Sequence, residues 1–195
     1  AIFDHRQNKF MARTPSNMLP LGTEAPNFSL PDTISGQILS LKDVRGSRGT
    51  AIFFICNHCP FVVHVNPTLV AVTERYINEG IGFVGISSND AVHYPQDGPQ
   101  EMKRHAAQAG YAFPYLYDES QEIAKAYDAA CTPDIYLFDH DNKLVYRGQL
   151  DSSRPGNGII SDGSDLSQAI DRLLASEDPM ENQKPSIGCN IKWKS

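Results

Sequence analysis

The sequence feature that most restricts the fold is an apolar run at residues 50–55 that leads into the pattern CNHCP at residues 56–60. A continuous run rich in Ile and Phe is typical of a strand buried on both faces of a sheet. Apolar residues then recur at helical spacing over residues 59–79, where Pro67 is expected to kink the helix. Residues 81–87 form a second buried run. The order strand, helix, strand predicts two parallel strands joined by a helix.

The rest of the chain continues this alternation of strands and helices. A hairpin around the Asp141-Asn142 turn and a last helix preceded by Ser164 and Asp165 as caps complete the pattern. We therefore expect an α/β fold, a three-layer sandwich with a mixed central sheet and helices on both faces. The further strands are expected at residues 37–41, 113–117, 134–139 and 143–149, and the further helices at residues 100–109, 121–127 and 166–174.

Composition limits the class of protein. The chain has 195 residues, of which 41% are hydrophobic and 21% charged, so one large domain fits and disorder, collagen and coiled coil are excluded as dominant states. The longest apolar run, at residues 51–56, is far shorter than the roughly 20 residues of a transmembrane helix. Seventeen Lys and Arg against 23 Asp and Glu give a net charge of −6, which makes nucleic acid and anionic membranes poor partners.

Three segments are expected along the chain. Residues 1–19 form an N-terminal arm, of which residues 1–10 are vector-encoded or disordered because Met11 offers a plausible start. Residues 20–176 form the folded domain. Residues 177–195 form an irregular tail that packs back on the domain, because it carries Ile, Cys and Trp side chains.

Cysteine spacing carries the chemistry. Cys56 and Cys59 stand three positions apart at the start of a helix, a spacing at which a disulfide closes with little backbone movement. The helix dipole and the free amides of the first turn stabilise a thiolate at Cys56. Protonated His58 would stabilise it further and make the disulfide more oxidising. A zinc site is disfavoured because the chain has no second pair of cysteines at this spacing.

Three stretches of the chain resemble the thioredoxin-like superfamily, in its peroxiredoxin-like (AhpC/TSA, redoxin) branch. The first is residues 22–30, where Gly22, Ala25 and Pro26 precede Phe28 and Leu30 as at the start of alkyl hydroperoxide reductase and thiol-specific antioxidant proteins. The second is the C-N-H-C pattern, and the third is the Thr-Pro pair at residues 132–133. The resemblance covers residues 20–176.

The resemblance implies a role for each residue of the motif. Cys56 is implied as the nucleophile that attacks a substrate disulfide or thiol adduct, and Cys59 as the thiol that resolves the mixed disulfide. Thr132 and Pro133 are implied to shape a substrate groove, with a cis peptide bond before Pro133.

Other residues are expected to adjust the site. His58, Asn57 and Pro60 are expected to tune the cysteine pair. Cys131 is implied to lie close to the pair, where it is either a buried hydrophobic side chain or a third exchanging thiol. Cys189 is a resolving thiol, a dimer bridge or inert, and the inert role is favoured.

The leading hypothesis is a thiol–disulfide oxidoreductase that acts through a Cys56/Cys59 dithiol on protein or small-molecule thiols and disulfides. This chemistry needs no dissociable cofactor. One alternative is a non-standard thiol peroxidase with antioxidant activity. The peroxidase motif P-x-x-x-[ST]-x-x-C is absent, because Gly49 and Phe53 occupy its positions. The other alternative is a copper-delivery protein that binds the metal through the same pair, with Cys131 or His58 as a further ligand.

The sequence leaves assembly and compartment open. A monomer and a homodimer both fit. A charged N-terminus without an apolar stretch suggests the cytoplasm, with a periplasmic or exported protein as the alternative if a signal peptide has been removed.

Overall fold

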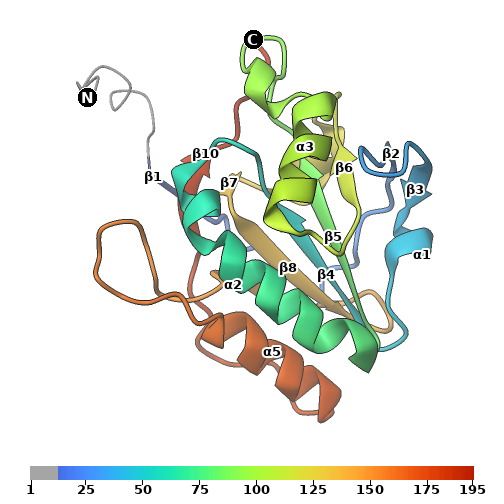
Figure 1. Cartoon of the computed structure of the whole chain (residues 1–195). Helices are drawn as coiled ribbons and strands as arrows, with labels where there is room; N and C mark the ends of the chain where they lie inside the picture. Colours follow the sequence, from blue (N-terminus) through green and yellow to red (C-terminus); the bar gives the residue numbers. More distant parts are fainter. Residues whose placement is uncertain (1–12) are drawn as a thin grey trace.

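A mixed five-stranded sheet forms the centre of the computed structural model, which describes residues 13–195. Its strand order is β6-β5-β4-β8-β9 (Figure 1). Strands β4, β5 and β6 run parallel, and β8 and β9 are antiparallel to their neighbours. The strands are β1 (Arg13–Pro15), β2 (Ser29–Pro31), β3 (Ile38–Ser40), β4 (Gly49–Phe54), β5 (Ile81–Ser87), β6 (Tyr115–Tyr117), β7 (Cys131–Thr132), β8 (Asp134–Asp139), β9 (Leu144–Gly148) and β10 (Ile187–Asn190). The helices are α1 (Leu41–Val44), α2 (Pro60–Tyr76), η2 (Ile77–Glu79), η3 (Pro95–Asp97), α3 (Pro99–Ala109), α4 (Glu122–Ala126) and α5 (Ser164–Leu174).

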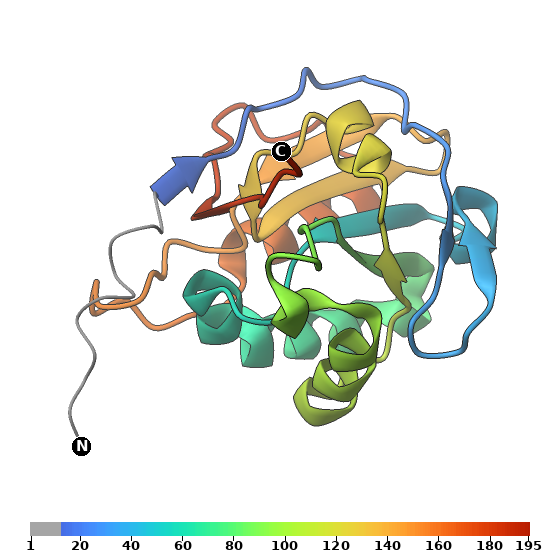
Figure 2. The ribbon, with the colours of Figure 1, turned by 90° about the horizontal axis from the view of Figure 1, so that it is seen from above.

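The central strand β4 divides the core into two parts. Its alternate side chains point to opposite faces of the sheet, as the two-residue period of a strand requires. Ala51, Phe53 and Ile55 join one core with residues of α2, α3 and α5. Ile52 and Phe54 join the other with residues of α1 and α4. Figures 1 and 2 show α2 and α5 side by side on one face of the sheet and α4, in yellow, on the other. The fold is thus the expected three-layer α/β sandwich.

A second, small sheet joins the two ends of the described chain. Its order is β1-β10-β7, with both pairings antiparallel. In this sheet Cys189 of β10 lies opposite Thr132 of β7. The tail thus contributes a strand where the sequence predicted irregular structure, and residues 13–15 of the predicted arm form a strand as well. Residues 1–12 lie outside the described part, so the expectations for residues 1–10 and for Met11 are not addressed.

Most predicted elements are present, with shifts at their ends. Strands β5 and β8 have the predicted bounds. The predicted cap of α5 was wrong, because Gly163 is the N-cap, with a φ of 68°, and Ser164 opens the helix. Helix α2 contains Pro67 and runs from Pro60 to Tyr76, and the 3-10 helix η2 follows it to Glu79. Among the described residues, no helix has the length and apolar character needed to cross a membrane.

Candidate active site

The CNHC pattern lies where the sequence predicted it, between the end of β4 and the start of α2. Cys59 is the N-cap of α2 and Pro60 occupies the first turn, where its missing N–H leaves no hydrogen bond unmade. Cys56 is only 1% exposed and Cys59 is fully buried. The strand and the helix therefore hold both sulfurs beneath the surface at the end of the sheet.

The disulfide of the structure joins Cys59 to Cys189, across 130 residues of sequence, and Cys56 is a free thiol. The expected Cys56–Cys59 bond is therefore not the one present, and the expectation that Cys189 is inert was wrong. The cause lies in the tail, which adds β10 to the edge of β7 and so brings Cys189 to the N-terminus of α2. The strand β10 is only four residues long, too short to show an alternation of apolar and polar residues from which the sequence could predict it.

Polar contacts hold the tail on both sides of Cys189. The hydroxyl of Ser186 donates to the carbonyl of Pro133, with 2.5 Å between the oxygens. The backbone N–H of Lys192 donates to the Asn89 side chain at 2.9 Å, and the Gln121 amide donates to the Lys192 carbonyl at 2.8 Å. The tail is therefore anchored independently of the disulfide.

Cys56 is surrounded differently from what the sequence predicted. Burial, and then the charge of Asp97, raise the pKa of the Cys56 thiol to about 12. Hydrogen bonds lower the pKa of Cys56, but by less than burial raises it. They come from the Thr132 hydroxyl, 3.6 Å from the sulfur, and from the backbone amides of His58 and Cys59. The predicted stabilised thiolate is thus outweighed by desolvation, which favours the neutral thiol.

A buried carboxylate, Asp97, organises the residues around the motif, and sequence analysis missed it. Its Oδ1 accepts a hydrogen bond from the backbone of Asn57 at 2.9 Å, and its Oδ2 accepts one from the Asn89 side chain at 2.9 Å. Oδ2 also lies 2.5 Å from Nδ1 of His58, whose ring stacks on that of Tyr94. Although burial raises its pKa, the hydrogen bonds from His58 and Asn89 bring the pKa of Asp97 below its usual value.

The Thr132–Pro133 peptide bond is cis, which confirms that prediction. The tail lies over this edge, although Pro133 still lines a small pocket together with Phe61 and Ile187. Strand β10 lies against them so closely that a Cβ on Gly188 would stand 1.9 Å from the Thr132 carbonyl oxygen. At Thr132 the tail therefore covers the edge where the sequence predicted a substrate groove.

Cys131 lies on the other side of its strand from the cysteine pair. Thr132 directs its hydroxyl toward Cys56, and consecutive strand residues point to opposite faces. Cys131 instead has its sulfur 3.6 Å from the Pro133 carbonyl, and burial raises the pKa of its thiol. The third cysteine at the site is Cys189 rather than Cys131.

Three donor groups could approach a metal ion. Donor atoms of Cys56, His58 and Asp97 lie within 4.8 Å of one another. The imidazole and the carboxylate already contact each other at 2.5 Å, and we assign no metal to the three groups. The copper alternative needs Cys59, which the disulfide removes from the donor set in this form.

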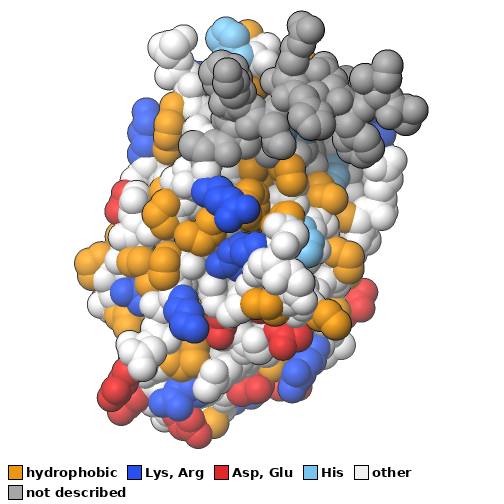
Figure 3. Space-filling view, turned by 90° about the vertical axis from the view of Figure 1, so that its left-hand side faces the viewer, with side chains coloured by type: hydrophobic (Ala, Val, Ile, Leu, Met, Phe, Trp, Pro, Cys, Tyr) orange, Lys and Arg blue, Asp and Glu red, His pale blue; other side chains and the backbone are white. Residues whose placement is uncertain are grey.

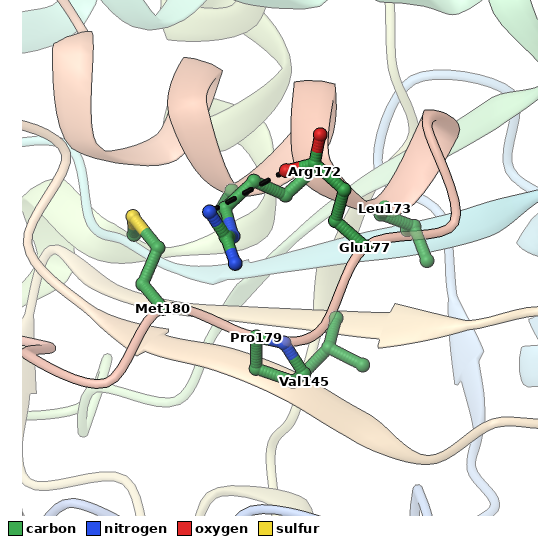
Figure 4. A pocket seen from close by; sticks show the side chains of 7 residues that line it. Val145, Arg172, Leu173, Glu177, Pro179 and Met180 are labelled. Carbon is green, nitrogen blue, oxygen red and sulfur yellow. Dashed lines mark ion pairs between the residues drawn. The ribbon is translucent and has the colours of Figure 1, made fainter.

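The surface of the molecule offers a second hollow apart from the cysteine site. Figure 3 shows basic and hydrophobic side chains interspersed across the middle of one face, with acidic side chains gathered toward its lower end. Figure 4 shows a small cleft between α5, β9 and the tail, lined by Val145, Leu173 and Met180. An Arg172–Glu177 ion pair of 3.4 Å crosses it. This cleft contains none of the cysteines.

The fold and a buried disulfide beside a free thiol define a thioredoxin-like redox protein. Residues 21–147 match the model of the AhpC/TSA family, so the chain belongs to that family. A "Putative peroxiredoxin" of Mycobacterium tuberculosis is 26% identical over 144 residues, which cover 68% of this chain and 86% of that protein.

Solved structures agree with this placement. An uncharacterized conserved protein from Geobacillus kaustophilus is 56% identical with a TM-score of 0.93, covering 94% of this chain and 97% of that one. A hypothetical protein from Sinorhizobium meliloti 1021 is 44% identical with a TM-score of 0.91, covering 93% and 99%. The thioredoxin domain of a thiol-disulfide oxidoreductase from Bacteroides vulgatus, at 19% identity and a TM-score of 0.62 over 80% and 99%, shares the fold.

Proposed function

We propose that the protein is a thiol–disulfide oxidoreductase whose oxidised form is the Cys59–Cys189 disulfide and whose reduced form is the corresponding dithiol. The observation that carries the proposal is a disulfide sulfur at the N-terminus of α2 with a free thiol, Cys56, three residues earlier. Disulfide exchange proceeds by attack of a thiolate on a disulfide sulfur, and a mixed disulfide is the intermediate.

Cys59 is the central sulfur of this proposal. When the disulfide is reduced, Cys59 stands at the N-cap of a 17-residue helix, where the free amides and the helix dipole favour a thiolate. A thiolate is the attacking species in exchange with a substrate disulfide. We therefore propose Cys59, rather than the Cys56 that the sequence indicated, as the nucleophile, because Cys59 is the sulfur that takes part in the disulfide and stands at the N-cap of α2.

Substrates are protein or small-molecule thiols and disulfides. In the oxidised form the disulfide sulfurs belong to side chains that are at most 2% exposed, and β10 covers the Thr132–Pro133 edge. A substrate must therefore displace part of this cover before it reaches Cys59. This burial favours small reductants over folded protein partners in the first step.

A turnover assay tests the proposal. The purified protein is given an oxidised substrate, either insulin or a small disulfide, with dithiothreitol as reductant, and the rate above the uncatalysed reaction is recorded. Cys59→Ser is expected to reduce this rate to the uncatalysed level. Cys131→Ser, which removes a buried free thiol facing away from the pair, is the matched control and is expected to retain turnover. Equal rates in the Cys59→Ser variant and the native protein would contradict the proposal.

A thiol peroxidase is the second candidate, favoured by membership of the AhpC/TSA family and by the peroxiredoxin name of the relative from Mycobacterium tuberculosis. A peroxidase oxidises one cysteine to a sulfenic acid before a disulfide forms. Hydrogen peroxide added to the reduced protein would then oxidise Cys59 to a sulfenic acid much faster than it oxidises a small-molecule thiol in solution. Slow, nonselective oxidation leaves the oxidoreductase as the better account.

We propose the cytoplasm as the compartment, with the periplasm as the alternative. A cytoplasmic protein would cycle between the disulfide and the dithiol, whereas a periplasmic one would stay oxidised. Thiol trapping in intact cells separates the two.

A further inference from the structure

We propose that Cys59 exchanges its disulfide partner within one chain, from Cys189 to Cys56 and back, so that Cys189 is a further exchanging thiol of the site. This inference rests on the proposed function. Its consequence is that a substrate held on Cys59 as a mixed disulfide can be released by either of two thiols.

Thr132 shows that both thiols meet Cys59 at one place. The Cys59 sulfur lies 3.3 Å from the Thr132 carbonyl oxygen, and the Cys56 sulfur lies 3.6 Å from the Thr132 hydroxyl. Cys189 lies opposite the same Thr132 in the β10–β7 register. A single residue of β7 therefore stands beside all three cysteines.

The anchors of the tail keep Cys189 in place after its bond breaks. Ser186 is held by Pro133 on one side, and Lys192 is held by Asn89 and Gln121 on the other. A thiol tethered so close has a high effective concentration toward Cys59, which makes its return fast. Asn89 also donates to Asp97 beside Cys56, so the tail anchor and the surroundings of Cys56 share one side chain.

The exchange conserves electrons and protons. The Cys56 thiol gives its proton to the imidazole of His58, which contacts Asp97 through Nδ1 and has a ring nitrogen within 4.8 Å of the Cys56 sulfur. The Cys56 sulfur then bonds to the sulfur of Cys59 while the Cys59–Cys189 bond breaks. The electron pair of the broken bond leaves on Cys189, which takes up a proton. One disulfide is exchanged for another, so no external oxidant or reductant is consumed.

Mapping the disulfide in the absence of any substrate tests the inference. Oxidised protein, freed of small thiols, is incubated at several pH values, stopped with acid, unfolded, alkylated and digested for mass spectrometry. We expect alkylation to appear at Cys189 as it falls at Cys56, with one disulfide per chain throughout. Cys56→Ser is expected to show no alkylation at Cys189, while Cys131→Ser is expected to behave as the native protein does.

The inference is overturned if every oxidised chain carries the same single disulfide at all pH values. If Cys56→Ser does not fold, the alkylation of Cys56 and Cys189 in the native protein, followed over time, tests the inference without the variant. Failure of the proposed function has a different signature, namely turnover that survives in Cys59→Ser. The mapping contains no substrate, so the two failures are separable.

Discussion

Cys189 of β10 lies opposite Thr132 of β7 in the antiparallel pair of these strands. Strand β10, the one strand that the described tail forms, therefore lies against the residue that precedes the cis-proline Pro133. Thr132 contacts the sulfurs of Cys56 and Cys59 through its hydroxyl and carbonyl oxygens. The tail is therefore part of the redox site rather than a cover added to a finished domain.

The first prediction concerns the reactivity of Cys56. Because burial and the charge of Asp97 raise the pKa of its thiol to about 12, only about one thiol in 100,000 is ionised at pH 7. Alkylation of Cys56 in the folded, oxidised protein is expected to be slow at pH 7. Its rate is expected to rise about tenfold per pH unit up to about pH 10, measured by mass spectrometry with iodoacetamide.

Asp97→Asn tests the electrostatic part of this account. Removal of the carboxylate charge lowers the pKa of Cys56, so alkylation at a fixed pH is expected to become several-fold faster. Glu101→Gln removes an exposed carboxylate of α3 and is the matched control, with no expected change. If Asp97→Asn keeps the native circular dichroism spectrum and Cys56 is alkylated at an unchanged rate, burial alone sets the pKa of Cys56, and the electrostatic part of the account is contradicted.

The second prediction concerns stability against redox state. The disulfide closes a loop across 130 residues, for which the chain-entropy model gives a stabilisation of about 5 kcal/mol and typical measurements give about 2–4 kcal/mol. Urea unfolding is expected to show a loss in this range when reductant is added. Cys189→Ser is expected to match the reduced native protein when both are measured with reductant present. A native protein equally stable in both states contradicts a closed Cys59–Cys189 bond.

The third prediction concerns Asp134, which is buried and accepts hydrogen bonds from Ser16, Ala130 and Tyr136. Burial raises the pKa of Asp134 from 3.8 to about 7. The folded state therefore holds a proton that the unfolded state releases above about pH 4, so stability falls as pH rises from 4 through 7. The difference in unfolding free energy between the native protein and Asp134→Asn is expected to decline by up to about 1.4 kcal/mol per pH unit in that window. A difference that is flat with pH contradicts the raised pKa.

The fourth prediction concerns Gly188. A Cβ there would stand 1.9 Å from the Thr132 carbonyl oxygen, and a backbone oxygen cannot turn aside as a side chain can. Gly188→Ala is expected to push β10 from β7, destabilise the protein by about 1–3 kcal/mol and slow closure of the disulfide on reoxidation. Closure at the native rate, followed by free-thiol titration, would show that the register of β10 does not position Cys189.

The sequence sufficed for the parts of the fold with a repeating pattern. Apolar runs predicted β4 and β5, and residues at helical spacing predicted α2 between them. These predictions placed the CNHC pattern at the junction of β4 and α2. The Thr-Pro pair announced a cis bond through the resemblance. These signals are local, so a single sequence contains them.

The rest depends on contacts between distant segments. Cys189 reaches Cys59 because a four-residue strand adds to the edge of a two-residue one, and neither is long enough to show a period. Asp97 sits in a short 3-10 turn that folds back over the motif, so its role comes from the hydrogen bonds with Asn57 and Asn89 rather than from its neighbours in sequence. A loop residue of this kind looks the same as a solvated turn until its partners are known.

The measurement that tests the central claim most directly is a redox titration of the native protein in glutathione buffers, with each cysteine mapped by alkylation and mass spectrometry. The account predicts one reversible two-electron transition in which Cys59 belongs to every disulfide formed and Cys131 remains a thiol throughout. A disulfide that leaves Cys59 out, or a Cys59 that never closes at any poise, would contradict it.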